Sequence, residues 1–280
     1  MKIIGIGDNV VDFYEDRGEM FPGGNALNVA VFCKRYGVEK SSYVGLVGND
    51  QAGNHVLDTL RAENIDVTHV LQAIGVNGEA RVTLDEQGDR IFVGSNKEFS
   101  IQSQLKLNFN KNIVEFIKEH DLLHTSVFSH IEKDLEDLAE IISISFDFST
   151  RRDEEYLKAV CPYLEFGFFS GGDLSKEECI DLMKHVQKLG VKKVGLTRGS
   201  KGSLFLVDDE LYEQPIVEGE VVDTLGAGDS YISMLLTKYY EHQDIQKAMH
   251  EGAVAAVQTC GDYGAFGYGV EKNGFVKNNL

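Results

Sequence analysis

The stretch VVDTLGAGDSY, residues 221–231, carries the strongest signal in this chain for both fold and function. A flexible Gly-Ala-Gly segment precedes an acidic residue, Asp229, and an amphipathic pattern that predicts a helix over 229–240. The backbone N–H groups of Gly226, Ala227 and Gly228 would point out of this helix N-terminus, where the helix dipole also favours negative charge. The stretch therefore predicts a binding site for an anion.

Asp229 stands directly beside this predicted anion site. A carboxylate repels an anion unless it has another task, such as accepting the proton of a hydroxyl nucleophile. The alternative is that Asp229 caps its own helix, which Asp often does. The spacing alone leaves both interpretations open.

On either side of this stretch, apolar runs of strand length alternate with longer amphipathic segments, which is typical of an α/β protein with a mainly parallel sheet. The pattern predicts strands over 2–7, 42–48, 122–125, 144–148, 164–169 and 193–197, and a hairpin over 203–214. It predicts helices over 25–36, 54–63, 176–189, 229–240 and 245–259.

The pattern changes between residues 68 and 95, where 68–74, 79–85 and 90–95 alternate as short strands separated by glycines. These strands predict an antiparallel insertion that forms a lid or a dimer surface. No repeat, linker or low-complexity tract interrupts the chain. We therefore expect a single α/β domain over 1–280, with a β lid contributed by about 10–22 and 68–98.

Composition narrows the function. The 280 residues hold 45 acidic and 27 basic side chains, and the net charge of −18 repels nucleic acids and anionic membranes. Four scattered cysteines show no C-x-x-C pair or zinc-ligand spacing, and the first apolar run is too short for a signal peptide. We expect a cytoplasmic protein with reduced thiols and small-molecule partners.

Familiar nucleotide motifs are missing. Gly5-Ile6-Gly7 follows the first strand as in a dinucleotide fingerprint, but Val10 stands where the third glycine belongs. There is no P-loop, no protein-kinase glycine loop and no H-E-x-x-H pair. A nicotinamide-dependent oxidoreductase or a metalloenzyme is therefore not expected.

Two further motifs suit hydroxyl recognition. In FPGGNALNVA, residues 21–30, Gly23 and Gly24 permit a close backbone approach, and the amides of Asn25 and Asn28 lie one helical turn apart. In GDNVVD, residues 7–12, the side chains of Asp8, Asn9 and Asp12 follow the first strand, at the usual ligand edge of such a sheet. The alternatives are a glycine turn with an N-cap at Asn25, and an Asx turn.

Together these motifs resemble the ribokinase-like (PfkB) sugar-kinase family, whose signatures are a Gly-Gly segment near the N-terminus and a D-T-x-G-A-G-D segment near the C-terminus. Here they are Gly23-Gly24-Asn25-x-x-Asn28 and residues 223–229. Their order and spacing extend the resemblance over essentially the full chain. It implies a ribokinase-like three-layer α/β/α sandwich with a mainly parallel sheet and a small antiparallel β lid.

The resemblance also implies an activity, ATP-dependent transfer of the γ-phosphoryl group to a primary hydroxyl of a small sugar. Asp229 would be the catalytic base, and Gly226, Ala227 and Gly228 the anion hole. The acceptor would be held by Asp8, Asn9, Asp12, Gly23, Gly24 and Asn28, and by Arg90 of the lid unless Arg90 is a solvated strand residue. The nucleotide would contact Thr197, Gly199, Gly202, Gly226 and Gly228. Mg²⁺ would accompany ATP, and K⁺ is compatible with the resemblance.

Two segments depart from the family pattern. The N-x-x-E segment linked to magnesium and phosphate is replaced by Ser170-Gly171-Gly172-Asp173, so the metal-binding residues are not assigned. The D-x-N-x-R segment becomes Asp147-Phe148-Ser149-Thr150-Arg151, with Ser149 in place of Asn.

Within the family, the short N-terminal segment and GGNALNVAV most resemble the bacterial fructoselysine 6-kinases. This branch implies a fructosamine acceptor such as fructoselysine, phosphorylated at its 6-position. The acids Glu15, Asp16 and Glu19 would attract its amine, unless they form only a solvated turn. The alternatives are a kinase for ribose, fructose or adenosine, and a non-catalytic sugar or nucleotide sensor, although a sensor is expected to lack Asp229. A homodimer through the lid is also expected.

Overall fold

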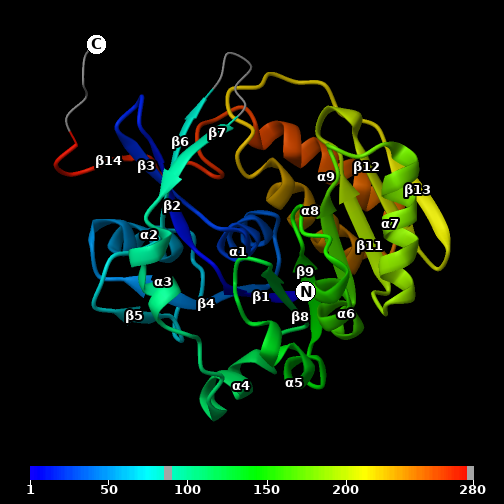
Figure 1. The fold of residues 1–280 in the computed structure, drawn as a ribbon, viewed down its shortest axis with the longest axis horizontal. Helices are drawn as coiled ribbons and strands as arrows, with labels where there is room; N and C mark the ends of the chain where they lie inside the picture. Colours follow the sequence, from blue (N-terminus) through cyan, green and yellow to red (C-terminus); the bar gives the residue numbers. More distant parts are fainter. Residues whose placement is uncertain (85–89, 276–280) are drawn as a thin grey trace.

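A nine-stranded sheet forms the centre of the molecule (Figure 1). The computed structural model describes residues 1–84 and 90–275. The strand order is β13-β12-β11-β10-β9-β8-β1-β4-β5. In chain order these strands are β1 (Lys2–Gly7), β4 (Lys40–Gly48), β5 (Leu71–Ala73), β8 (Leu122–Ser126), β9 (Ser143–Asp147), β10 (Phe166–Ser170), β11 (Lys193–Thr197), β12 (Ser203–Val207) and β13 (Glu210–Gln214).

All neighbouring strands from β5 to β11 pair in parallel, and only the hairpin β12–β13 adds antiparallel pairs. The predicted parallel sheet is therefore confirmed. One strand was placed wrongly: 68–74 was expected in the lid, but β5 pairs in parallel with β4, Leu46 opposite Leu71, at the edge of the large sheet. Three residues with exposed side chains carry no pattern that distinguishes a sheet edge from a lid.

Helices cover both faces of this sheet. One face packs against α1 (Asn25–Arg35), α2 (Gln51–Ala62), α8 (Ala227–His242) and α9 (Ile245–Thr259). The other packs against α4 (Lys111–Ile117), α5 (Leu135–Ala139), α6 (Glu154–Val160) and α7 (Lys176–Lys188). Alternate residues of β1 serve the two faces, since Ile3 packs with α8 and Ile4 with the α6–α7 side. The result is the expected α/β/α sandwich.

A second sheet of five strands stands beside the edge of the sandwich, in the order β14-β3-β2-β6-β7 (Figure 1). Its strands are β2 (Val10–Tyr14), β3 (Glu19–Gly23), β6 (Glu79–Leu84), β7 (Arg90–Ser95) and β14 (Val270–Glu271). It is not wholly antiparallel, because β2 and β6, from its two sequence segments, pair in parallel. We call it the small sheet.

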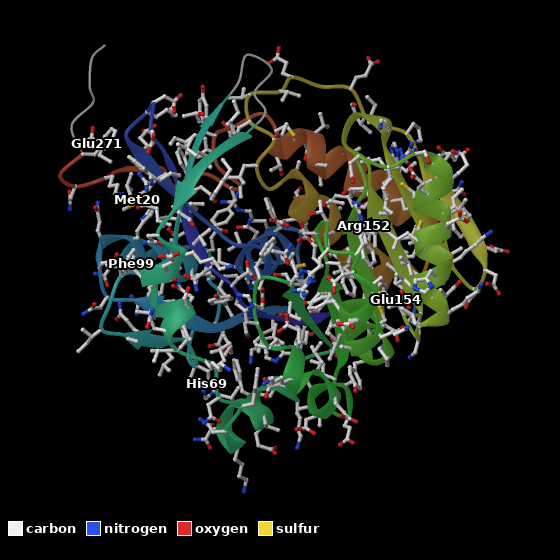
Figure 2. The ribbon with its side chains drawn as sticks, in the orientation of Figure 1. Met20, His69, Phe99, Arg152, Glu154 and Glu271 are labelled. Carbon is white, nitrogen blue, oxygen red and sulfur yellow. The ribbon has the colours of Figure 1, made fainter. Side chains whose placement is uncertain are left out.

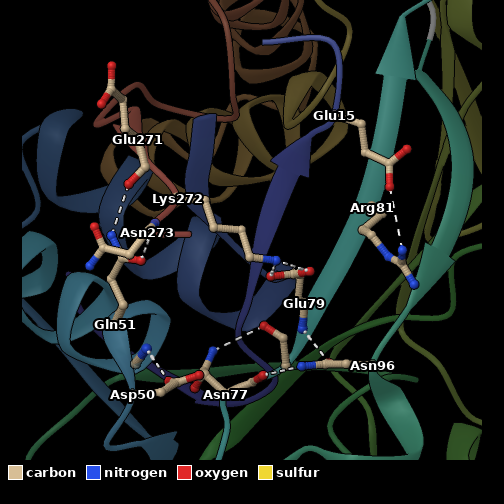
Figure 3. Close-up of polar contacts among 12 residues, drawn as sticks. Glu15, Asp50, Gln51, Asn77, Glu79, Arg81, Asn96, Glu271, Lys272 and Asn273 are labelled. Atoms are coloured by element: carbon tan, nitrogen blue, oxygen red, sulfur yellow. Dashed lines mark hydrogen bonds and ion pairs between the residues drawn. The ribbon is translucent and has the colours of Figure 1, made fainter. Parts of the chain in front are cut away.

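The C-terminal segment ties the small sheet to the sandwich (Figure 3). Lys272 Nζ lies 2.6 Å from both carboxylate oxygens of Glu79 on β6. Gln51, the first residue of α2, donates to the carbonyl of Glu271 at 2.9 Å and accepts from the N–H of Asn273 at 2.9 Å. This tether could not be predicted from the sequence, because the two-residue strand β14 carries no periodic signal.

None of the four cysteines forms a disulfide within the described residues, and all four are buried. None of the helices in the described part of the chain is long and apolar enough to cross a membrane. Figure 2 shows side chains filling the spaces between the elements. Met20 lies in the small sheet, and Arg152 lies near the end of β10 in the sandwich.

Candidate active site

A cavity of about 830 Å³ lies between the two sheets. Its floor is made by the carboxyl ends of β1, β9 and β10, by the loop after β8 and by the first residues of α1 and α8. Its roof is made by β2, β6 and β7 of the small sheet. Ligands of open α/β sheets bind at this end of the strands, so the cavity is the candidate active site.

Asp229 is the third residue of α8 and lines the cavity. Two amides of α1 hold its carboxylate: Asn25 Nδ2 donates to Oδ1 at 2.7 Å, and Asn28 Nδ2 donates to Oδ2 at 2.6 Å. Asn25 and Asn28 do share one helix face, as their spacing predicts, but these amide groups point at an acid. They fix the orientation of the Asp229 carboxylate, which a general base requires.

A second carboxylate, Asp147 at the end of β9, shares this arrangement. Asn25 Nδ2 also donates to Asp147 Oδ2 at 2.9 Å, so one amide nitrogen bridges the two acids. Burial raises the pKa of Asp147 to about 7, and the nearby negative charge of Asp229 adds to the rise. The pair can therefore hold one proton near neutral pH.

His124 on β8 sets the orientation of the Asn25 side chain. Because the Asn25 nitrogen serves the two acids, its Oδ1 must accept from His124 Nε2, 2.9 Å away. The other ring nitrogen then accepts from the Ser145 hydroxyl at 2.9 Å. Burial lowers the pKa of His124 to about 3, so the ring stays neutral. The hydrogen bonds that join Asn25, His124 and Ser145 could not be predicted from the sequence, because these residues come from three separate elements.

Asp8 and Asn9 line the cavity, but their side chains are largely engaged by the protein. The Asp8 carboxylate accepts from the N–H of Asn25 at 2.6 Å and from the Ser126 and Ser129 hydroxyls at 2.8 and 2.9 Å, which caps α1 from outside the helix. Asn9 donates to the Leu46 carbonyl at 2.7 Å, and its other contacts include the hydroxyl of Tyr43. The alternative of an N-cap at Asn25 is therefore wrong: Gly24 is the N-cap residue, and Asp8 accepts the N–H of Asn25, the first residue of the helix.

Asp12, the third predicted acceptor-binding residue of GDNVVD, lies on β2, so the small sheet brings its carboxylate to the cavity. Gly23 on β3 lies against it, and a Cβ at Gly23 would come within 2.3 Å of Asp12 Oδ2. Gly24 has φ 109°, and a Cβ there would lie 2.6 Å from the Cα of Asn9. The Gly-Gly pair therefore lets β3 turn into α1 directly beside the loop after β1.

The Gly-Ala-Gly segment begins α8, with Gly226 as the N-cap in a left-handed conformation, φ 77°. Gly226 and Gly228 line the cavity, while the N–H of Ala227 turns back to the Thr224 carbonyl at 3.3 Å. The first N–H groups of a helix have no intrahelical partner. An anion in the cavity can therefore meet the N-terminus of α8 next to Asp229.

Asp223 anchors this segment from below and is fully buried. Its carboxylate accepts from the N–H of Leu225 at 2.9 Å, from the N–H of Gly264 at 2.9 Å and from the hydroxyl of Tyr14. Tyr14 ends β2 and is itself fully buried. One hydrogen bond thus connects the small sheet directly to the loop that begins α8.

The predicted nucleotide residues lie two strands away from Asp147. Thr197 ends β11 and pairs with Ser170 of β10, and Gly199 and Gly202 form the tight turn that follows. None of the three is among the residues that line the cavity. In the same turn Arg198 has a buried Nε with no hydrogen-bond partner in the described residues.

The segment Ser170-Gly171-Gly172-Asp173, which departs from the family pattern, is held by two basic side chains. Arg152 donates to the Ser170 carbonyl and lies 2.8 and 2.9 Å from the two carboxylate oxygens of Asp173 (Arg152 is labelled in Figure 2). Lys201 donates to the Gly172 carbonyl at 2.9 Å. Among the described residues, no group of three or more His, Cys, Asp or Glu side chains is arranged to hold a metal ion.

Two predictions concern the small sheet. Arg90 begins β7, but its side chain lies outside the described residues. Glu15 and Glu19 form ion pairs on the sheet, with Arg81 at 3.5 Å (Figure 3) and with Arg17 at 2.7 Å. Neither of them, nor Asp16, lines the cavity. The expected attraction of an amine by this acidic turn is therefore not supported by its position.

A carboxylate fixed at a helix N-terminus, over a parallel sheet and under a second sheet, defines a phosphotransferase of the ribokinase fold. The chain belongs to the pfkB family of carbohydrate kinases, whose family model matches residues 2–158 and 163–271. The resemblance drawn from the two glycine motifs is therefore confirmed.

Curated relatives extend this finding. The chain is 54% identical to "Fructosamine kinase FrlD" of Bacillus subtilis over 96% of this chain and 94% of that protein. It is 30% identical to "Fructoselysine 6-kinase" of Escherichia coli over 93% and 98% of the two chains. Among solved structures, an uncharacterized sugar kinase from Pyrococcus horikoshii in complex with ATP matches with a TM-score of 0.75 and 24% identity, over 94% of each chain.

Proposed function

We propose that this carbohydrate kinase transfers the γ-phosphoryl group of ATP to the 6-hydroxyl of a fructosamine, such as fructoselysine. The observation that carries the proposal is the Asp229 carboxylate, fixed by two amides beside the N-terminus of α8. The 54% identity to a fructosamine kinase supports the choice of acceptor. Phosphoryl transfer needs mainly positioning and charge stabilisation, which this cavity supplies.

In the proposed reaction, Asp229 accepts the proton of the acceptor hydroxyl as the oxygen of that hydroxyl bonds to the γ-phosphorus. The bond from that phosphorus to the β-phosphate oxygen breaks, and its electrons leave with ADP. The N–H groups at Gly226 and Gly228 stabilise the charge on the transferred group. Asp12 and Asn28 hold acceptor hydroxyls, and the small sheet serves as a lid.

ATP would lie along the carboxyl ends of β9, β10 and β11, with its phosphates toward Gly226 and Gly228 and its nucleoside toward Thr197, Gly199 and Gly202. The unpartnered Arg198 Nε suits this side of the site, since phosphate is an anion. Mg²⁺ would arrive bound to ATP and neutralise its phosphates, a task that Asp173 is poorly placed to share because Arg152 already pairs with it.

Two further proposals concern the whole protein. We propose a cytoplasmic location, in keeping with four buried cysteines that form no disulfide within the described residues. A homodimer through the small sheet would cover Ile91 and Val93 of β7, which are exposed apolar side chains. Sedimentation velocity should show a dimer that Ile91→Glu dissociates, and a monomeric wild type would exclude it.

The test of the acceptor compares kcat/KM for fructoselysine, fructose, ribose and adenosine with MgATP, followed by ³¹P NMR of each product. We expect fructoselysine to be preferred and to be phosphorylated at its 6-position. A site built to bond to substrate groups strongly rejects an analogue that lacks them. Preference for ribose, adenosine or free fructose would leave the family intact and overturn the fructosamine assignment.

The test of the base is Asp229→Asn, which should retain ATP binding and lower kcat about 10²- to 10⁴-fold, the usual contribution of a general base. The variant also turns one acceptor of the Asn25 and Asn28 amides into a donor. We therefore expect a loss of unfolding free energy of about 1–3 kcal/mol as well. Turnover at nearly the wild-type rate would show that Asp229 is not the base.

A further inference from the structure

The cavity continues past the predicted sugar site into a second region with a different lining. This extension is formed by β7, by the turn η1 (Lys97–Phe99) with the helix α3 (Ile101–Gln104) and its following loop, and by the loop after β8. In Figure 1, α3 lies below the small sheet, on the side away from α8 and α9. The residues of the extension that matter below are Phe92, Lys97, Leu105, Lys106 and Phe128.

The walls of the extension are apolar and open. Phe92 is 61% exposed, Phe128 is 55% exposed and Leu105 is 44% exposed, although all three line a concave site. Exposed apolar side chains within a cavity favour a ligand that covers them. A sugar ring bearing hydroxyl groups held near Asp229 would leave these side chains bare.

Two lysines, Lys97 and Lys106, line the same extension. Within residues 1–84 and 90–275, no carboxylate lies within the 4.0 Å ion-pair distance of either ammonium group. Lys106 acts on the carboxyl group of Asp134 only at longer range. In a chain with 45 acids and 27 bases, two lysines without ion partners at a cavity wall form a local site for an anion.

The protein holds this extension in a fixed place. Gln102 of α3 donates to Asn9 Oδ1 at 3.0 Å and to the Leu46 carbonyl at 3.1 Å, and accepts from the N–H of Gly78 at 3.0 Å. The Ser100 hydroxyl donates to the Lys97 carbonyl at 3.2 Å. The turn that carries Lys97 is therefore anchored next to Asn9, at the edge of the predicted sugar site.

We propose that the extension binds the amino-acid part of a glycated amino acid, with its aliphatic chain against Phe92, Leu105 and Phe128 and its carboxylate at Lys97 and Lys106. The proposal rests on the proposed function, because it requires an amine-linked ketose in the adjoining site. The apolar wall suits the methylene chain, and the two ammonium groups suit a carboxylate at its end. The site thus selects for the carboxylate of the acceptor as well as for its sugar.

The experiment compares fructoselysine with its carboxamide, fructoselysinamide, which keeps the sugar, both amines and the aliphatic chain but lacks the carboxylate. The wild-type enzyme should show a kcat/KM about tenfold higher for fructoselysine, mainly through KM, and this preference should shrink at high salt. The double variant Lys97→Gln/Lys106→Gln should lose the preference while keeping its kcat/KM for fructoselysinamide. The matched control Lys111→Gln/Lys133→Gln removes the same charge from exposed positions outside the cavity and should behave as wild type.

The outcomes separate the two proposals. If the wild-type enzyme phosphorylates neither compound, the proposed fructosamine activity fails and the extension has no role in it. If it phosphorylates both compounds equally well, or if the double variant keeps the wild-type preference, the fructosamine activity stands and the carboxylate site is refuted. A double variant that loses activity equally toward both compounds would also refute it, because a carboxylate site cannot affect a substrate without a carboxylate.

Discussion

Replacing Asp147 by Asn should change how stability depends on pH. The carboxyl group of Asp147 has a pKa of about 7 in the folded protein, against 3.8 for an unperturbed aspartate. Between these two values the folded chain binds one proton more than the unfolded chain. The stability that this proton contributes is fully present below pH 3.8 and is lost as the pH rises through 7.

The magnitude follows from the size of the shift. Each pH unit inside this window changes the unfolding free energy by about 1.4 kcal/mol, so the whole window amounts to about 4 kcal/mol. Measurement from about pH 5.5 to about pH 8.5 avoids the isoelectric region near 4.8 and should capture about 2 kcal/mol of this loss.

The assay is urea unfolding followed by far-ultraviolet circular dichroism, since the chain contains no Trp for fluorescence. The wild-type protein should lose stability from low to high pH, and Asp147→Asn should lack the part of this loss that belongs to Asp147. Asp181→Asn, at an exposed position on α7, is the matched control and should follow the wild type. If wild type and Asp147→Asn lose stability in parallel, Asp147 does not titrate near neutral pH and the account of the acid pair is wrong.

Three further predictions address the loop before α8 and the metal. Tyr14→Phe removes a donor from the buried Asp223 carboxylate and should lower the unfolding free energy by about 1.5–3 kcal/mol in the same urea assay; no change would show that the bond is not needed. Gly226→Ala should abolish turnover in a steady-state assay, because its Cβ would lie 2.7 Å from the Cα of Ala265 at a φ of 77°. The control is Gly267→Ala, which tests the strain of a left-handed backbone alone, because a Cβ at Gly267 meets no atom within 4 Å. Excess chelator should stop phosphoryl transfer and added Mg²⁺ should restore it; full activity without a divalent ion would contradict a MgATP substrate.

Much of the fold follows from local patterns. The strands over 2–7 and 193–197 and the helix over 245–259 have the predicted bounds, because each is a continuous buried run or an amphipathic segment with clear ends. The strand over 71–73 was misplaced, since its partner β4 is more than twenty residues away and its own side chains are exposed. Strand pairing at an edge depends on tertiary contacts that a short segment does not encode.

The candidate active site, like the fold, is predicted from the sequence only in part. The sequence identifies Asp229 and the two amides of α1 as chemically important, but it does not reveal that the amides bind the acid. The hydrogen bonds between the amides and Asp229 join residues about 200 positions apart. Asp147 takes part in this arrangement only because β9 pairs with β8, which in turn pairs with β1. His124 could not have been found at all, since a single histidine in an apolar strand is ordinarily a core residue.

Through the bond between Tyr14 and Asp223, the binding of the two substrates would become thermodynamically coupled. An acceptor that draws β2 toward the cavity acts on the same buried unit that presents the start of α8 to a phosphate. Whatever free energy the acceptor adds to nucleotide binding, the nucleotide must add equally to acceptor binding. A coupling of about 1–3 kcal/mol would tighten each substrate about 5- to 150-fold in the presence of the other, so that ATP would bind more weakly before the sugar is in place.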